Sequence, residues 1–306
     1  MQTRRKLTTE SSRHGAGFTR RSRRTNTAAV FLAGALAACG GGDTGGETAG
    51  EPAEGAAATP MVVADAGTIR GMVNFVGDAP ANAAIDMSEE QICAAKHPDG
   101  ATAEAVVASG GKLANVFIYI KEGLTGDHPA PGGQALIDQV GCVYHPHVIG
   151  VQAGQEIAFR NSDGILHNIK AAPTANRTFN ISQPTNMTST RTFTTAEVMV
   201  PVQCDVHGWM QMYIGVVAHP YFGVSGADGS FTIANLPPGT YTVEAWHEKY
   251  GVQTQQVTVA PNGTADLAFE YSAAMAANAV VPLGAPIDPH DHGPVRTTAM
   301  GSPASH

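Results

Sequence analysis

Three residues with metal-binding side chains lie within one seven-residue segment, CDVHGWM, at Cys204, His207 and Met210. A fourth, His167, stands far upstream in the segment NSDGILHNI. A thiolate and a thioether are soft donors that favour Cu(I), and imidazole accepts both copper oxidation states. Two imidazoles, one thiolate and a weak thioether describe a site for electron transfer. The residues therefore predict one copper ion, clamped by a loop between the strand-like runs EVMVPVQ and MYIGVV.

The segments around these residues resemble the cupredoxin family, which includes plastocyanin and amicyanin. The run YHPHVIGVQAGQEIAFRNSDGILHNI looks like the part of that fold leading to the first His ligand. The run FNISQPTNMTSTRTFTTAEVMVPVQCDVHGWMQMYIGVV is similar to its closing half. The resemblance implies a type 1 copper site made of His167, Cys204, His207 and Met210. It also implies that Asn168 braces the ligand loop through backbone hydrogen bonds.

Two methionines compete for the axial position in this resemblance. Met210 gives the spacing Cys-x2-His-x2-Met, as in amicyanin, and Met212 gives Cys-x2-His-x4-Met, as in plastocyanin. Aligning the following strand with those of the family favours Met210 and places Met212 inside the strand. Zinc would leave Met210 unexplained, because zinc sites use Cys and His without a thioether. A dinuclear purple-copper loop needs two cysteines before the His, and Cys204 is alone.

The N-terminal region predicts an exported lipoprotein. A basic stretch is followed by the short apolar run TAAVFLAGALAAC, so residues 1–38 form an expected signal peptide. The sequence LAAC resembles a bacterial lipobox, which implies that Cys39 is acylated and anchors the chain to a membrane without spanning it. Residues 39–66 lack large apolar side chains until their end and predict a disordered tether. We expect a periplasmic or cell-surface location.

Charge excludes one class of partner. Without residues 1–38 the chain keeps 10 Lys or Arg residues against 25 Asp or Glu residues. This acidic balance argues against nucleic-acid binding, which needs a basic surface. It suits a soluble exported protein, and it also suits docking to a basic redox partner.

The two remaining cysteines form an even pair. Cys93 and Cys142 are expected to make a disulfide in an oxidising compartment. Closing a loop of about fifty residues would stabilise the fold by roughly 4 kcal/mol in the chain-entropy model. The alternative is a second metal site that combines both cysteines with His97, His145 and His147, although this spacing matches no known type of site.

The rest of the chain has strand-like alternation and no sustained helical period, which predicts an all-β protein. Residues 228–241, DGSFTIANLPPGTY, resemble the hallmark of the carboxypeptidase regulatory-like family, whose fold is related to transthyretin. The opening strands of that family are missing just upstream, but GTIRGMVNFVG and NVFIYI could supply them much earlier. The predicted fold is a cupredoxin Greek-key β-sandwich with a small transthyretin-like β-sandwich.

We therefore expect one domain to be inserted in the other, and the alternative is two domains in tandem. The expected regions are the first part of the regulatory-like sandwich at 67–135, the cupredoxin domain at 136–218, the second part of the sandwich at 219–272, and a disordered tail at 273–306. The tail carries His290, His292 and His306, which could bind metal weakly.

Three function classes fit these observations. The first is an electron carrier, not an enzyme, with one type 1 copper ion and a partner such as a c-type cytochrome or a respiratory complex. In the family the loop His lies near the surface, so electrons would leave through His207, beside Gly208 and Trp209. The second class is a copper-handling or copper-storage lipoprotein. The third is a structural or carbohydrate-binding lipoprotein. An exposed Trp246 could bind carbohydrate, although the period-two alternation around it favours strand packing.

Overall fold

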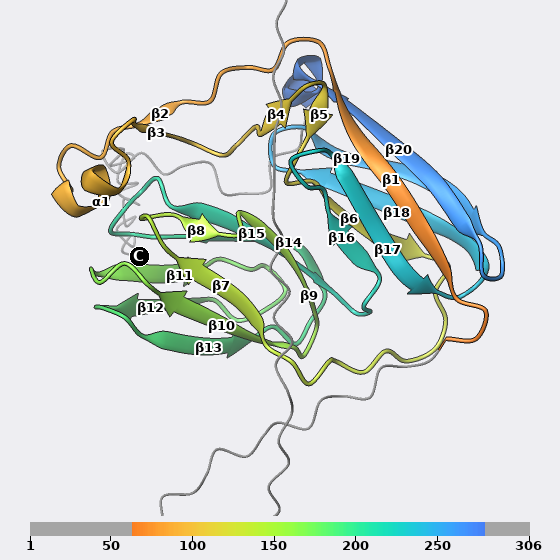
Figure 1. Cartoon of the computed structure of the whole chain (residues 1–306). Coiled ribbons are helices and arrows are strands. Elements are labelled where there is room, and N and C mark those ends of the chain that lie inside the picture. The colour runs from red at the N-terminus through yellow and green to blue at the C-terminus, as the bar shows by residue number, and fades with distance from the viewer. Residues whose placement is uncertain (1–62, 279–306) are drawn as a thin grey trace, which may run out of the picture. The chain divides into compact units, whose positions relative to one another are not determined.

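The computed structural model of the protein describes residues 63–278 (Figure 1). The expected signal peptide, Cys39 and His290, His292 and His306 lie outside the described residues. Strands dominate the described part, which confirms the all-β prediction. Its helices are α1 (Gln91–Lys96) and the 3-10 helix η1 (Ala273–Asn278), and neither has the length and hydropathy needed to cross a membrane.

One β-sandwich is built from strands at both ends of the described chain (Figure 1). Its first sheet contains β1 (Gly67–Val76), β4 (Ala108–Ser109), β5 (Lys112–Leu113), β17 (Ser230–Leu236) and β20 (Thr264–Ser272). Its second sheet contains β6 (Phe117–Glu122), β16 (Phe222–Val224), β18 (Gly239–His247) and β19 (Gly251–Val259). The second sheet has the order β16-β6-β18-β19.

The strand β1 holds the first sheet together. It pairs antiparallel with β17 and parallel with β20. It therefore lies between these two strands, which do not pair with each other. Its side chains alternate as a half-buried strand requires, and Ile69, Val73 and Phe75 enter the core. Gly71 is needed because a Cβ there would lie 2.1 Å from the ring of Phe231. Residues before 123 and after 221 therefore share one hydrophobic core.

A second β-sandwich lies between these two parts in sequence. One sheet has the order β13-β10-β7-β8 and the other the order β12-β11-β14-β15-β9. The strands of the first are β7 (Ala135–Gln139), β8 (Tyr144–His145), β10 (Glu156–Asn161) and β13 (Thr188–Thr192). Those of the second are β9 (Val148–Gln152), β11 (His167–Ala171), β12 (Phe179–Gln183), β14 (Glu197–Gln203) and β15 (Gln211–Val217). The segment between β14 and β15 carries three of the four predicted metal ligands, and the fourth, His167, begins β11.

Residues 77–107 contribute no strand to either sheet of the first sandwich, although Val106 packs in its core. They leave it after β1 and form β2 (Ala84–Ile85), α1 and β3 (Ala101–Thr102), and β2 and β3 pair only with each other. We call residues 77–107 the cover segment, because α1 packs beside the predicted ligand loop through Cys93. A second difference concerns the C-terminal tail, whose first six residues form η1.

A pair of glycines makes room for contact between the two sandwiches. Gly150 of β9 and Gly215 of β15 are directly paired, and the ring of Phe117 lies over both. A Cβ on Gly215 would come within 2.5 Å of that ring, so only glycine allows this approach. Trp246 joins the same cluster and is 4% exposed, which fits strand packing and does not suit carbohydrate binding.

Removal of the second sandwich tests whether the first is independent. Tyr119 of β6 pairs with Phe222 of β16, so a short Gly-Ser link can replace residues 123–218. We expect such a chain, with Cys93 changed to Ser, to unfold cooperatively with a β-type circular dichroism spectrum. Residues 219–272 alone should stay unfolded, because β17 and β20 would lack β1. Independent folding of 219–272 would instead support domains in tandem.

Candidate metal centre

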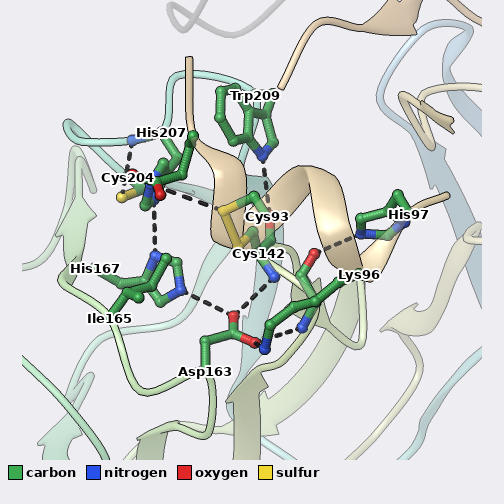
Figure 2. Close-up of a disulfide and its surroundings, with 12 residues drawn as sticks. Cys93, Lys96, His97, Cys142, Asp163, Ile165, His167, Cys204, His207 and Trp209 are labelled. Carbon is green, nitrogen blue, oxygen red and sulfur yellow. Dashed lines mark hydrogen bonds and ion pairs between the residues drawn. A yellow bond between two sulfur atoms is a disulfide. The ribbon is translucent and has the colours of Figure 1, made fainter. Parts of the chain in front are cut away.

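Three predicted ligands converge at one end of the second sandwich (Figure 2). His167 begins β11, Cys204 follows β14, and His207 lies in the connection to β15. One ligand atom from each lies within 4.8 Å of the others, and all three residues are buried. The two Nδ1 atoms of His167 and His207 are 2.9 Å apart, so the imidazoles face each other through the same ring position. Backbone elements far apart in sequence therefore aim two nitrogens and one sulfur at a common point.

The ligand loop is closed by backbone hydrogen bonds. Cys204 N donates to Met210 O at 3.1 Å, and Met210 N donates to His207 O at 2.9 Å. The loop thus starts and ends where β14 and β15 pair, at Gln203 and Gln211. Met210 is fully buried in the same closed loop, whereas Met212 is buried within β15. The axial role of Met210 stays a prediction.

Backbone amides stabilise the charge on the Cys204 sulfur. Asn168 N donates to Sγ at 3.4 Å and His207 N donates to it at 3.3 Å. Burial alone would raise the pKa of this thiol, but hydrogen bonds from His167, His207 and these two amides lower the pKa to about 6. The Asn168 side chain also accepts from Asp205 N, so Asn168 ties the two ligand-bearing segments together.

An aspartate orients the first histidine. Asp163 Oδ2 accepts from His167 Nε2 at 2.9 Å, which leaves the lone pair of Nδ1 directed to the ligand cluster. The same carboxylate accepts from Lys96 Nζ at 2.5 Å and from the backbone N–H groups of Gly141 and Cys142, both at 2.7 Å (Figure 2). Burial would raise the pKa of Asp163, but these donors hold it well below its usual range. Sequence analysis did not identify Asp163. Its position four residues before His167 was the one sign that it could contact this ligand.

The cover segment shields the second histidine. Cys93 and Cys142 form a disulfide, and Cys93 Sγ lies 4.0 Å from His207 Nε2. Trp209 packs beside the disulfide, with its ring centre 5.1 Å from that of His207, and its indole N–H donates to Cys142 O. His207 is 3% exposed, so its ring is covered and not itself open to solvent, although its Nε2 lies 3.9 Å from the exposed carboxylate of Glu90.

The alternative second metal site is not assembled. Both of its cysteines are in the disulfide and offer no thiolate. His97 Nε2 bonds to Gly141 O at 2.7 Å, and His147 Nε2 bonds to Glu248 at 2.5 Å. His145 is exposed. Cys142, Asp163 and His167 form a further cluster. The sulfur of Cys142 is in the disulfide and His167 is a ligand of the first candidate site, so this cluster is part of the surroundings of that site.

The donor set fits copper. Two imidazole nitrogens and a thiolate of lowered pKa are borderline and soft donors, and none of the three is a carboxylate. Hydrogen bonds hold His167 and the Cys204 sulfur, and the rings of Trp209 and His207 pack together, so the cluster would need little rearrangement to receive an ion. When bound, copper would supply one-electron exchange between Cu(I) and Cu(II).

Comparisons with known proteins give one family match, over a part of the chain, and several similar solved structures. Residues 218–272 match the carboxypeptidase regulatory-like domain family. A purple cupredoxin from Nitrosopumilus maritimus is 20% identical, with 27% of this chain and 98% of that chain covered and a TM-score of 0.24. A reduced mutant of amicyanin is 18% identical, covering 28% and 82%, at a TM-score of 0.26.

A copper-containing nitrite reductase from Thermus scotoductus SA-01 is 19% identical, with 36% of this chain and 25% of that chain covered and a TM-score of 0.26. No curated protein matches the chain. These three structures have TM-scores of 0.24 to 0.26, which are too low to carry a functional argument. The case for a function depends on the side chains of the site.

The thiolate can be titrated directly in metal-free protein. Because the pKa of Cys204 is lowered to about 6, the thiol should be present below that pH and the thiolate above it. Ultraviolet thiolate absorbance should therefore rise with a midpoint near pH 6, and Cys204→Ser should remove this step while any step from Cys39 remains. A single step at the ordinary thiol pKa would contradict the hydrogen-bonded environment described above. Metal affinity should fall below the same pH, since the ligand must lose its proton.

Asp163→Asn tests the orientation of His167. The amide keeps the shape but loses the negative charge that fixes the His167 Nε2–H, so Cu(I) affinity should fall about 10- to 100-fold. Competition with a chromophoric Cu(I) chelator measures this. Asp138→Asn is the matched control, because Asp138 pairs with the exposed Arg160 and touches no ligand. Equal affinity in both variants would show that Asp163 does not position the ligand.

Proposed function

We propose that this protein is an exported electron carrier that holds one type 1 copper ion with His167, Cys204, His207 and Met210. The observation that carries the proposal is the convergence of His167 Nδ1, His207 Nδ1 and the Cys204 thiolate in a buried site. Two imidazoles and a thiolate with a weak thioether describe copper centres that transfer electrons. Zinc would leave the buried Met210 without a role.

The surroundings favour a carrier over a catalyst. The donors come from one closed loop and one strand end, and the disulfide and Trp209 cover His207. An ion bound in this way offers no open position to a substrate, so electrons would enter and leave without a bond to the metal. Asp163 and the amides of Asn168 and His207 hold the ligands in place, which limits structural change between oxidation states.

The exit route differs from the one expected by resemblance. His207 is covered, and the half-buried Trp209 ring stands beside it. We propose that electrons pass through the Trp209 ring to a partner such as a c-type cytochrome or a respiratory complex. The acidic chain would dock a basic surface of that partner and has no role with nucleic acid. A lipid on Cys39 would hold the carrier at the periplasmic or cell-surface side of a bacterial membrane.

Colour tests the proposal. Copper-loaded protein should absorb strongly in the visible range, because charge transfer requires the Cys204 thiolate on the oxidised ion, and Cys204→Ser should bleach it. Met210→Leu should keep the colour and raise the reduction potential, whereas Met212→Leu should change neither. The reverse result for the methionines would assign Met212 as the axial ligand. A colourless wild-type protein that purifies with zinc would refute electron transfer.

Stoichiometry separates a carrier from a store. One copper ion should remain bound through repeated reduction and oxidation, and electron exchange with a basic cytochrome should slow as salt is added. Truncation after Asn278 is the control, because it removes His290, His292 and His306 and any weak copper they hold. Loss of copper on each reduction would favour copper handling instead.

A further inference from the structure

The strand β19 forms an unprotected edge of the first sandwich. It pairs with β18 along its whole length, from Gly251 to Val259, and with no other strand of residues 63–278. In an antiparallel pair some backbone N–H and C=O groups point away from the partner, so β19 presents such groups at the edge of its sheet. The strand contains no proline, no charged residue and no bulge, which are features that usually protect an edge. Its backbone can therefore accept a further strand.

Other edges in the described part of the chain are occupied, charged or short. The strand β20 is as long as β19, but it carries two exposed acids, and Gln253 and Gln255 of β19 donate to its carbonyl oxygens at 2.7 and 2.6 Å. The strand β17 lies against β16, since a Cβ on Gly223 would come within 3.1 Å of Thr232 O. In the second sandwich the strands at the sheet edges have at most five residues. The edge of β19 is thus the long and uncharged one.

Charge favours a second copy of this chain at that edge. Without residues 1–38 the chain keeps 10 basic against 25 acidic residues, so two copies repel each other over much of their surfaces. The side chains that β19 exposes are all uncharged, namely Val252, Thr254, Gln256 and Thr258. Two copies can therefore meet at this strand without bringing like charges together.

The two ends of β19 carry opposite charges. The exposed Lys249 precedes the strand. At the other end Asn262 follows the strand, and its side chain donates to the exposed carboxylate of Asp65 at 3.0 Å. Antiparallel pairing of two β19 strands brings the Lys249 end of each copy to the Asp65 end of the other. The charges at the two ends are then complementary twice, as a two-fold interface requires.

From these features we propose that β19 is a self-association site, at which a second copy adds its own β19 in antiparallel orientation with Gln256 of both copies at the two-fold axis. Thr254 then lies opposite Thr258, and Gln255 opposite Val257. Such pairs keep exposed positions on one face and inward positions on the other, and cross-strand threonine pairs are favourable. This interaction goes beyond electron carriage and needs no metal.

The dimer would leave both candidate metal centres free. Pairing joins the two four-stranded sheets into one continuous sheet through β19. The ligand loop and the start of β11 belong to the second sandwich and contribute nothing to this edge. Each copy therefore keeps its own ligands and its own Trp209.

Sedimentation equilibrium on the metal-free full chain tests the interface. Cys39→Ser is introduced so that no disulfide can link two chains. We expect a reversible dimer. Gln256→Lys/Thr258→Lys and Gln256→Glu/Thr258→Glu each place like charges at the axis, so each should raise the dimer dissociation constant at least about tenfold. An equimolar mixture of the two variants should dimerise again, because opposite charges then face each other.

The monomer should tolerate these changes. The neighbours of Gln256 and Thr258 on β18 are Thr242 and Thr240, so the added charges meet no charged side chain directly across the pair. Unchanged circular dichroism spectra and melting temperatures, measured at a concentration where wild type is monomeric, check this point. Thr188→Lys/Thr190→Lys is the matched control, because it adds the same charges to exposed positions of the edge strand β13 and should leave the dimer intact.

Several results would overturn the proposal: a monomeric wild type, a dimer formed by either charge variant alone, a mixture of the two that stays monomeric, or loss of the dimer in the β13 control. A wild type that dimerises only after truncation behind Asn278 would show that the C-terminal tail and not a second copy occupies the edge. Failure here leaves the copper proposal intact, because no metal is present.

Discussion

The carboxylate of Asp163 is the point on which the candidate metal centre and its cover depend. It accepts hydrogen bonds from His167, from Lys96 of α1 and from the backbone of Gly141 and Cys142. A buried carboxylate is tolerated only when donors surround it, and here they come from α1, from the turn at Gly141 and Cys142, and from the start of β11. The orientation of a metal ligand, the position of α1 and the turn that carries Cys142 are therefore fixed by one side chain.

The candidate ligands could be selected from sequence because three of them share one short loop, and because soft donors at that spacing suit few metals. The structure brings His167, Cys204 and His207 together. The strands could also be predicted, since β1 and β17 alternate regularly between buried and exposed positions. The structure of the cover segment could not be predicted from the sequence. Its strands are two residues long and α1 has six, so it has no period to detect. Its position comes from the disulfide and the Lys96–Asp163 pair, which join residues distant in sequence.

The shielding of His207 shows the limit of inference from a family. The ligand loop itself follows the expected spacing, and its backbone closes as a compact turn. What surrounds the loop is supplied by residues 77–107, which have no counterpart in the segments that carry the resemblance. Asp163 was missed for a related reason, because an aspartate beside a glycine is typical of an ordinary turn. Its role is evident only when Lys96 and Cys142 are brought to it.

The parallel pairing of β1 with β20 has a consequence for the order of folding. Thr68 of β1 pairs with Thr264 of β20, so β1 has no partner on this edge until the last strand has been synthesised. All strands of the second sandwich, from β7 to β15, are complete before β17 and β20 exist. During that interval the edges of β1 are open to pairing with other chains. Nascent chains that stall after residue 217 would thus combine a finished metal centre with an aggregation-prone strand, which makes the C-terminal strands the protective part of the molecule.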